Sequence, residues 1–127
     1  MATRSLAVVL HYKGYTLKDK LNFAMGSSFS IKCLWDFVLQ TDLIKQVPEL
    51  KVPVYIFQGK YDYQVSYVIA KEFAMTVNAP VKGFYTFENS AHSPCFEESE
   101  KMCHILHTDV LQEKADLSDN IECSIAK

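Results

Sequence analysis

The residues best suited to chemistry in this chain are an aspartate and a histidine, Asp62 and His92, thirty residues apart. Each follows an apolar segment of the composition that favours β-strands, at residues 52–57 and 83–87. A carboxylate can orient an imidazole and stabilise its cation while the ring carries a proton to or from a reacting group. The pair therefore predicts acid–base chemistry, with Asp62 as the orienting acid and His92 as the general base.

The nucleophile that would complete such a pair is absent from these 127 residues. A Gly-x-Ser-x-Gly elbow needs two glycines four residues apart, because its strained turn leaves no room for side chains beside the serine. The glycines are Gly14, Gly26, Gly59 and Gly83, and no two of them have that spacing. There is also no His-Gly-Gly-Gly run to supply oxyanion donors. We therefore expect this chain alone to have no hydrolase turnover.

The sequence between the two residues predicts how they are brought together. Apolar residues recur at helical spacing from Val65 to Val77, and Asn78-Ala-Pro80 ends that stretch. Strand, helix and strand then span about 36 residues, the length of a βαβ unit with parallel strands. Because the carboxyl ends of parallel strands share one edge of a sheet, Asp62 and His92 are expected to meet there.

The first predicted strand is apolar at successive positions, Val54, Tyr55, Ile56 and Phe57, rather than at alternate ones. That pattern is typical of a parallel strand that is covered on both faces. Two strands and three helices cannot easily supply both covers and both neighbouring strands. We therefore expect the predicted unit to be part of a larger sheet.

A helix is predicted upstream of this unit, where four apolar residues share one helix face: Ile31, Leu34, Trp35 and Val38. It should cover about residues 29–46, with Ser28 or Ser30 as its N-cap and Pro48 beyond its end. Residues 1–28 show no regular pattern. Downstream of His92 a last helix is expected, because Met102, Cys103, Leu106, Val110 and Leu111 fall at helical spacing.

The remaining polar stretches suggest only local roles. Glu97, Glu98 and Glu100 are expected to form the acidic first turn of the last helix, which the helix dipole favours. The tail that begins at Ala115 is polar, and we expect it to be frayed.

Composition limits the function classes. The apolar fraction of 49% is that of a globular protein, and a net charge of −2 gives no basic surface for nucleic acid or for a charged membrane. The apolar run at residues 6–10 is too short for a signal peptide or a membrane span, so a cytoplasmic location is expected. Four cysteines without a Cys-x-x-Cys pair are then expected to be free, buried thiols.

A metal site is not expected. Cys103 and His107 lie one helical turn apart, with His104 between them, but two side chains on one helix do not make a four-ligand site. No other motif in the chain suggests a metal or an organic cofactor.

The quoted segments resemble the C-terminal third of α/β-hydrolases, and most of all the proline iminopeptidase (prolyl aminopeptidase) branch. The likeness rests on Val-Pro-Val-Tyr-Ile-Phe-Gln-Gly-Lys-Tyr-Asp62, the helical stretch after it, and Phe87-Glu-Asn-Ser-Ala-His92-Ser-Pro94. It covers about residues 12–111. It implies an α/β fold in which a parallel βαβ unit with flanking helices forms the C-terminal part of the hydrolase core.

The resemblance also implies a division of the chain. Residues 1–50 would be an N-terminal segment and the remnant of a helical cap, residues 51–114 the βαβ-α part of the core, and residues 115–127 a polar tail. Within the cap remnant, Phe29 and Trp35 are candidate aromatic residues of a substrate pocket, although packing within the cap is the simpler explanation for both.

Three functional hypotheses follow. The first is part of a serine hydrolase that cleaves a small peptide, ester or amide once an N-terminal half supplies the serine. The second is a non-catalytic remnant that associates with itself or a partner through an exposed sheet edge. The third is an unrelated α/β module, in which Asp62 only ends a strand in a turn and His92 is an ordinary loop histidine.

Overall fold

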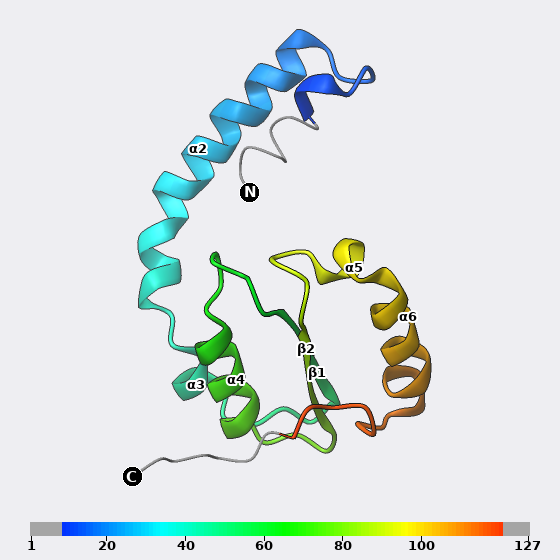
Figure 1. Ribbon diagram of the computed structural model, residues 1–127. Coiled ribbons are helices and arrows are strands. Elements are labelled where there is room, and N and C mark those ends of the chain that lie inside the picture. The colour runs from blue at the N-terminus through cyan, green and yellow to red at the C-terminus, as the bar shows by residue number, and fades with distance from the viewer. Residues whose placement is uncertain (1–8, 121–127) are drawn as a thin grey trace. The chain divides into compact units, whose positions relative to one another are not determined.

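The computed structural model describes residues 9–120, and the chain divides into two compact units between Asp42 and Leu43 (Figure 1). The described part of the first unit is helical, whereas the second contains a parallel two-stranded sheet with helices. The predicted α/β class is therefore confirmed. The functional division proposed at residues 50 and 114 stays a prediction.

The first unit consists mainly of one long helix, α2 (Leu17–Gln40). Its start is fixed by a capping box: the Thr16 hydroxyl accepts a hydrogen bond from the Asp19 amide at 3.2 Å, and the Asp19 carboxylate accepts one from the Thr16 amide at 2.9 Å. The helix thus begins at Leu17 rather than near Ser28 or Ser30. The prediction of irregular structure is wrong for residues 17–28, while residues 1–8 lie outside the described part.

The end of α2 also differs from the prediction of one helix through residue 46. Thr41 adopts an extended conformation, its amide bonds to the Val38 carbonyl, and its hydroxyl donates to the Phe37 carbonyl at 2.8 Å. These contacts satisfy carbonyl groups that a helix leaves unpaired at its end. The chain then begins a separate short helix, α3 (Leu43–Gln46), in the second unit.

No residue of α2 is buried. The apolar side chains occur on all sides of the helix, and their exposed members include Phe23, Phe29, Leu34, Trp35 and Phe37. Even so, no helix within residues 9–120 is long and apolar enough to cross a membrane. The helix therefore has an apolar surface that the described part of the first unit leaves uncovered.

The second unit is built on strands β1 (Val54–Gly59) and β2 (Lys82–Phe87), which pair in parallel from end to end. Helix α4 (Tyr67–Thr76) connects them, and the Ser66 side chain caps its start. The register pairs the last residue of each strand, Gly59 with Phe87. The predicted parallel βαβ unit is thus present, and both strands release the chain at the same edge of the sheet.

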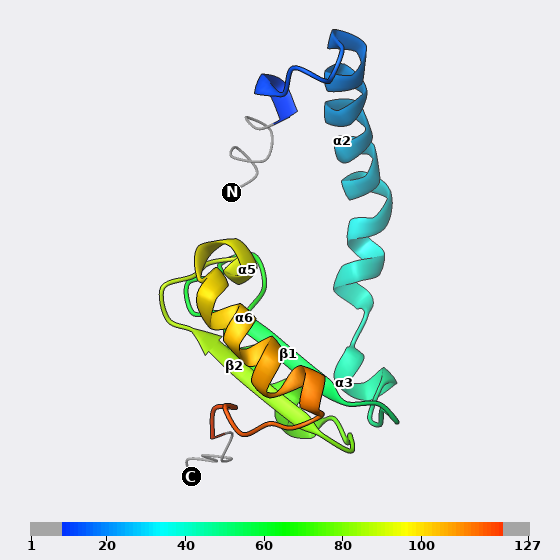
Figure 2. The same ribbon diagram turned by 90° about the vertical axis from the view of Figure 1, so that its right-hand side faces the viewer.

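Helices cover both faces of the sheet. Helix α6 (Ser99–Thr108) lies on one face and α4 on the other, as two perpendicular views show (Figures 1 and 2). The α6 face carries the aromatic core, which comprises Tyr85, Phe87 and Ile105 with Tyr55, Phe57 and Met102 packed around them. On the α4 face the Tyr67 ring meets the Phe84 ring edge-on, with 5.6 Å between centroids. Each large apolar side chain buried in this way contributes about 1.5–3 kcal/mol.

The outer edge of β2 is closed by polar contacts. The Phe84 amide donates to the Ser118 hydroxyl and the Phe84 carbonyl accepts from the Asp119 amide, at 3.0 and 2.9 Å. The Thr86 amide donates to the Asp119 carboxylate, and the Thr86 carbonyl accepts from the Lys101 ammonium. The prediction of a frayed tail is therefore wrong for Ser118 and Asp119, because this segment satisfies a strand edge.

The outer edge of β1 is different. The Val54 amide donates to the Val81 carbonyl and the Lys60 amide to the Phe87 carbonyl. The even-numbered residues of β1 therefore direct their backbone amides and carbonyls toward β2. In a parallel ladder the alternate residues point their amides and carbonyls the other way. Those of Tyr55 and Phe57 have no hydrogen-bond partner within the described part of the chain. The sheet thus has its backbone groups satisfied at the edge formed by β2 and unpaired at the edge formed by β1, within the described residues.

Candidate functional site

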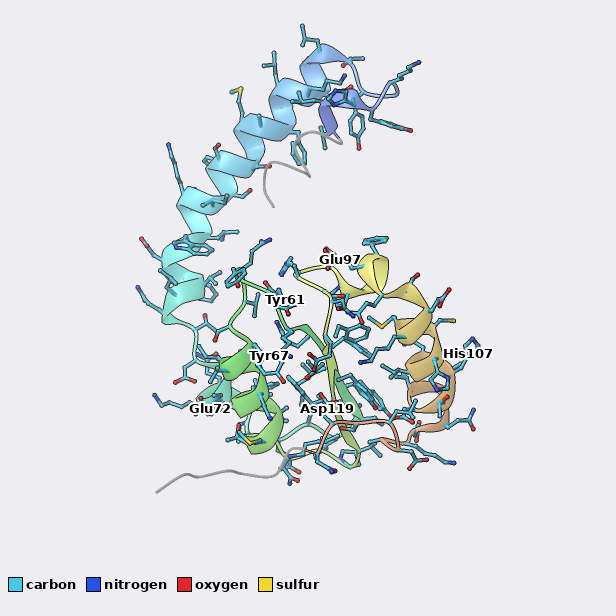
Figure 3. All side chains as sticks on the ribbon, viewed as in Figure 1. Tyr61, Tyr67, Glu72, Glu97, His107 and Asp119 are labelled. Atoms are coloured by element: carbon cyan, nitrogen blue, oxygen red, sulfur yellow. The ribbon has the colours of Figure 1, made fainter. Side chains whose placement is uncertain are left out.

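The site is formed by two loops that leave the paired strand ends. After β1 the chain turns tightly, with the Asp62 amide donating to the Gly59 carbonyl at 3.2 Å. The Tyr61 amide donates to the Ser90 carbonyl in the other loop at 3.0 Å. Tyr61 lies at this edge of the sheet in Figure 3. Backbone contacts between the loops therefore fix their relative position before any side chain is considered.

Glycine is required at position 59 because the two loops approach so closely. A Cβ atom there would lie 1.8 Å from the Ala91 carbonyl oxygen and 2.7 Å from the Ser90 carbonyl oxygen. Both are backbone atoms, so a larger residue could be accommodated only if one loop moved. Gly59 thus allows the residue before His92 to pack against the end of β1.

The loops bring Asp62 and His92 into direct contact. The Asp62 Oδ2 and His92 Nδ1 atoms are 2.8 Å apart. The other carboxylate oxygen of Asp62 accepts hydrogen bonds from the amides of Gln64 and Val65, at 2.8 and 3.1 Å. The side chain of Gln58, a buried residue of β1, donates to Asp62 Oδ2 at 3.3 Å. The carboxylate is therefore held on both oxygens.

These contacts favour the ionised carboxylate. Burial by itself raises the pKa of Asp62, since only 6% of its side chain is exposed. The hydrogen bond from His92 and those from the Gln64 and Val65 amides act in the opposite direction and prevail, so the pKa of Asp62 lies below its ordinary value. Asp62 is thus an anion over the whole neutral range, as an orienting acid must be.

His92 is arranged as a proton carrier would be. Its Nδ1 atom is engaged by Asp62, which favours the tautomer that leaves Nε2 as an acceptor. The side chain is 43% exposed, so the ring is partly open to a reacting group. The geometry can therefore support proton transfer at Nε2, with the resulting charge stabilised by the carboxylate behind it.

Three residues at the site were not anticipated as functional. Gln58 could have been noticed, because it is the one polar residue in an otherwise apolar strand and lies four residues before Asp62. Glu97 and Glu98 bind the loop that carries His92, through contacts to Ala91 and to Asn89 and Ser90. Their sequence pattern matches an ordinary acidic helix start, so it gave no signal of this role.

The aromatic candidates lie in the first unit. Phe29 and Trp35 are on α2, with 69% and 53% of their surfaces exposed. Their proposed part in a substrate pocket stays a prediction.

The residues considered for a metal are exposed on α6, and His107 lies on the side of that helix away from the sheet (Figure 3). Within residues 9–120 no three histidine, cysteine, aspartate or glutamate side chains are grouped as metal ligands would be. Cys33, Cys95 and Cys103 are free thiols, but they are exposed, so the expectation of buried thiols is wrong for these three. Cys123 lies outside the described residues.

Comparison with known proteins gives one informative likeness. The chain is 34% identical over 106 residues to the probable aminopeptidase YbaC of Bacillus subtilis (strain 168). The matched region is 81% of this chain but 33% of that protein, so the chain spans about a third of the length of the curated relative it matches. No family model and no solved structure matches the chain. Four fifths of the chain are thus similar to part of a probable aminopeptidase.

Proposed function

We propose that this chain carries the acid and the base of the Ser-Asp-His triad of an α/β-hydrolase of the proline iminopeptidase type, and that the serine comes from polypeptide outside these 127 residues. The observation that carries the proposal is the 2.8 Å contact between Asp62 and His92 at the carboxyl ends of adjacent parallel strands. The likeness to a probable aminopeptidase supports the same reaction class.

In this proposal His92 Nε2 takes the proton from the serine hydroxyl as the serine oxygen bonds to the substrate carbonyl carbon. The imidazolium then gives that proton to the leaving amine or alcohol as its bond to the carbonyl carbon breaks. Water releases the acyl group from the serine in a second round of the same transfers. Asp62 stays ionised throughout, holding the ring and stabilising its transient charge.

The substrate class follows from the resemblance alone. The expected substrate is a peptide with a small N-terminal residue, above all proline, or a small ester or amide. Phe29 and Trp35, two exposed aromatic residues of the proposed cap remnant, are the candidate residues to contact it.

A complementation experiment tests the proposal. The chain is mixed with a recombinant polypeptide that carries the rest of the Bacillus relative, and hydrolysis of prolyl p-nitroanilide is followed. We expect turnover in the mixture only, with a fluorophosphonate probe labelling the added polypeptide and not this chain. His92→Ala in the mixture should lower kcat by about 10⁴-fold or more. Turnover or probe labelling of this chain alone would overturn the proposal.

The open edge of β1 favours a second candidate function, which is binding of another strand without catalysis. The outward amides and carbonyls of Tyr55 and Phe57 form the kind of edge that pairs with a second chain. A second copy of this chain could supply such a strand. In that case light scattering should give a stable dimer.

A proline substitution tests the edge itself. Tyr55→Pro removes an outward amide and leaves the ladder to β2 intact, so the variant should be monomeric. Tyr55→Ala is the control, since it removes the same side chain and keeps the amide. A monomeric parent chain would contradict this second candidate.

A further inference from the structure

We infer that Glu97 and Glu98 act as positioning residues for His92, holding the loop that carries it through hydrogen bonds separate from the Asp62 contact. The catalytic consequence rests on the function proposed above, whereas the holding of the loop does not. Neither glutamate touches the imidazole, so neither is a catalytic residue. Their carboxylates bind the three residues that immediately precede His92.

Glu98 makes two of the three contacts. Its Oε2 atom accepts hydrogen bonds from the Ser90 hydroxyl at 2.5 Å and from the Asn89 amide at 3.0 Å. Ser90 is fully buried, so its hydroxyl needs a partner within the protein. A hydrogen bond to an ionised carboxylate is among the stronger kinds. Glu98 therefore anchors the loop at its buried point.

Glu97 makes the third contact. Its Oε2 atom accepts a hydrogen bond from the Ala91 amide at 2.7 Å, and Glu97 lies beside this loop in Figure 3. The carbonyl side of the same loop is bound elsewhere, because the Ser90 carbonyl accepts from the Tyr61 amide and the Ala91 carbonyl packs on Gly59. The hydrogen-bond donors of this loop are thus bound by Glu97 and Glu98, whereas its carbonyl groups contact the turn that follows β1.

The local fold explains why two adjacent glutamates can do this. Helix α5 (Pro94–Glu97) is a single turn that starts two residues after His92, and Glu98 occupies the break between α5 and α6 with φ −133° and ψ 54°. As the N-cap of α6, Glu98 makes no side-chain bond to that helix. Its carboxylate is therefore free to bind the preceding loop. The expectation that Glu97 and Glu98 merely complete an acidic first turn misses this contact.

Positioning matters for a proton carrier because reactivity falls steeply with misplacement. A displacement of about 1 Å can cost about 100-fold in rate. The Asp62 hydrogen bond fixes one ring nitrogen of His92 but leaves the backbone of its loop to other contacts. Glu97 and Glu98 supply those contacts from α5 and from the break before α6.

The test uses the whole 127-residue chain and no substrate. Amide hydrogen exchange is measured for Asn89 and Ala91, and the Nδ1 proton of His92 is followed by NMR. Glu98→Ala should speed exchange at Asn89 by about tenfold, as expected for loss of one hydrogen bond to a charged group. It should also broaden the Nδ1 proton signal. Glu98→Gln, which keeps an acceptor, should restore most of the protection.

Glu100→Ala is the matched control, because Glu100 lies in the first turn of α6 and has no contact with the loop. If Glu98→Ala behaves like Glu100→Ala in both measurements, the inference is wrong. Should Glu98→Ala fail to fold, Glu97→Ala removes the hydrogen bond to the Ala91 amide and must speed exchange at Ala91 by a similar factor.

The same variants in the complementation assay separate the positioning role from the proposed hydrolase function. Glu98→Ala should lower kcat by about 10- to 100-fold and leave KM within about twofold, because the loop rather than the substrate contact is affected. Faster exchange without any activity in the parent mixture would leave the positioning role standing and remove the proposed function. If Glu98→Ala shows normal exchange while the parent mixture is active, the proposed function stands and the positioning role is wrong.

Discussion

Helix α2 and strand β2 are both rich in apolar residues, yet they reach their structures by different means. None of the 24 residues of α2 is buried, whereas five of the six residues of β2 are. The contacts that define α2 join residues within one or two turns of each other, such as Thr16 and Asp19. Those of β2 join residues up to 35 positions apart, such as Phe84 and Asp119.

This difference has a functional consequence. The Asp62–His92 pair, its supporting residues and the core beneath it all belong to the second unit. A helix with apolar side chains on all sides gains most of its stability from whatever covers it. The site should therefore depend on the second unit, while α2 should tolerate change on its own surface.

A pair of phenylalanine substitutions tests the comparison with the largest expected effect. Phe87→Ala removes a fully buried ring and should lower the free energy of unfolding of the second unit by about 3–5 kcal/mol. Phe29→Ala removes an exposed ring from α2 and should change it by less than about 0.5 kcal/mol. Hydrogen exchange of the β2 amides measures both. Comparable losses in the two variants would contradict the division into units.

A pair of glycine substitutions should give effects of opposite sign. Gly59→Ala forces a Cβ atom onto the backbone of the His92 loop and should cost about 1–3 kcal/mol, with loss of the His92 Nδ1 proton signal. Gly26→Ala places its Cβ atom in open space outside the backbone of α2 and should stabilise α2 by about 1 kcal/mol. Helicity by circular dichroism and exchange at β2 distinguish them. A neutral Gly59→Ala would show that the loops are not held as closely as described.

The same contrast explains how much the sequence predicted. The meeting of Asp62 and His92 was predictable, because apolar periodicity encodes a βαβ unit and parallel strands end at one edge. The start of α2 also had a local signal in Thr16-Leu-Lys-Asp19, a capping box with aspartate in place of glutamate.

The contacts around the pair could not be predicted in the same way. Glu98 bonded to Ser90, and Asp119 bonded to the edge of β2, are side-chain contacts whose partners only the fold brings together. In sequence, such residues have the same polar pattern as a solvated helix start or a loose tail. Which of these polar side chains form such contacts depends on the backbone groups that the fold leaves unpaired.

The two units each contain an aspartate whose pKa is lowered. The pH dependence of stability can therefore be compared between the units. The hydrogen bond from the Thr16 hydroxyl lowers the pKa of Asp19, an exposed group. For Asp62 burial opposes ionisation, and the bonds from His92 and two amides overcome it. A carboxyl whose pKa is lower in the folded state stabilises that state above its ordinary value of 3.8, and the effect is lost as the pH falls through the folded-state pKa.

We therefore expect Asp62 to stabilise the second unit at neutral pH, and this contribution to be lost as the pH falls below 3.8 through the folded-state pKa. Asp62→Asn should remove that part of the pH dependence. Exchange at β2 measured against pH gives the result, and an unchanged pH profile in Asp62→Asn would show that the carboxylate is not held as described. Asp19→Asn should leave the profile of the second unit unaltered.

The smallest effect expected is loss of the cap on α2. Thr16→Ala removes the hydroxyl that accepts from the Asp19 amide, and an N-cap of this kind contributes about 1 kcal/mol. The loss should appear as fraying of the first turn of α2, with faster exchange near Asp19 and slightly lower helicity. Thr16→Ser retains the acceptor and should behave like the parent chain. Because the capping contacts are local, the His92 Nδ1 proton and the β2 amides should be unaffected, and a change in either would mean that the two units are coupled more tightly than their separate contacts indicate.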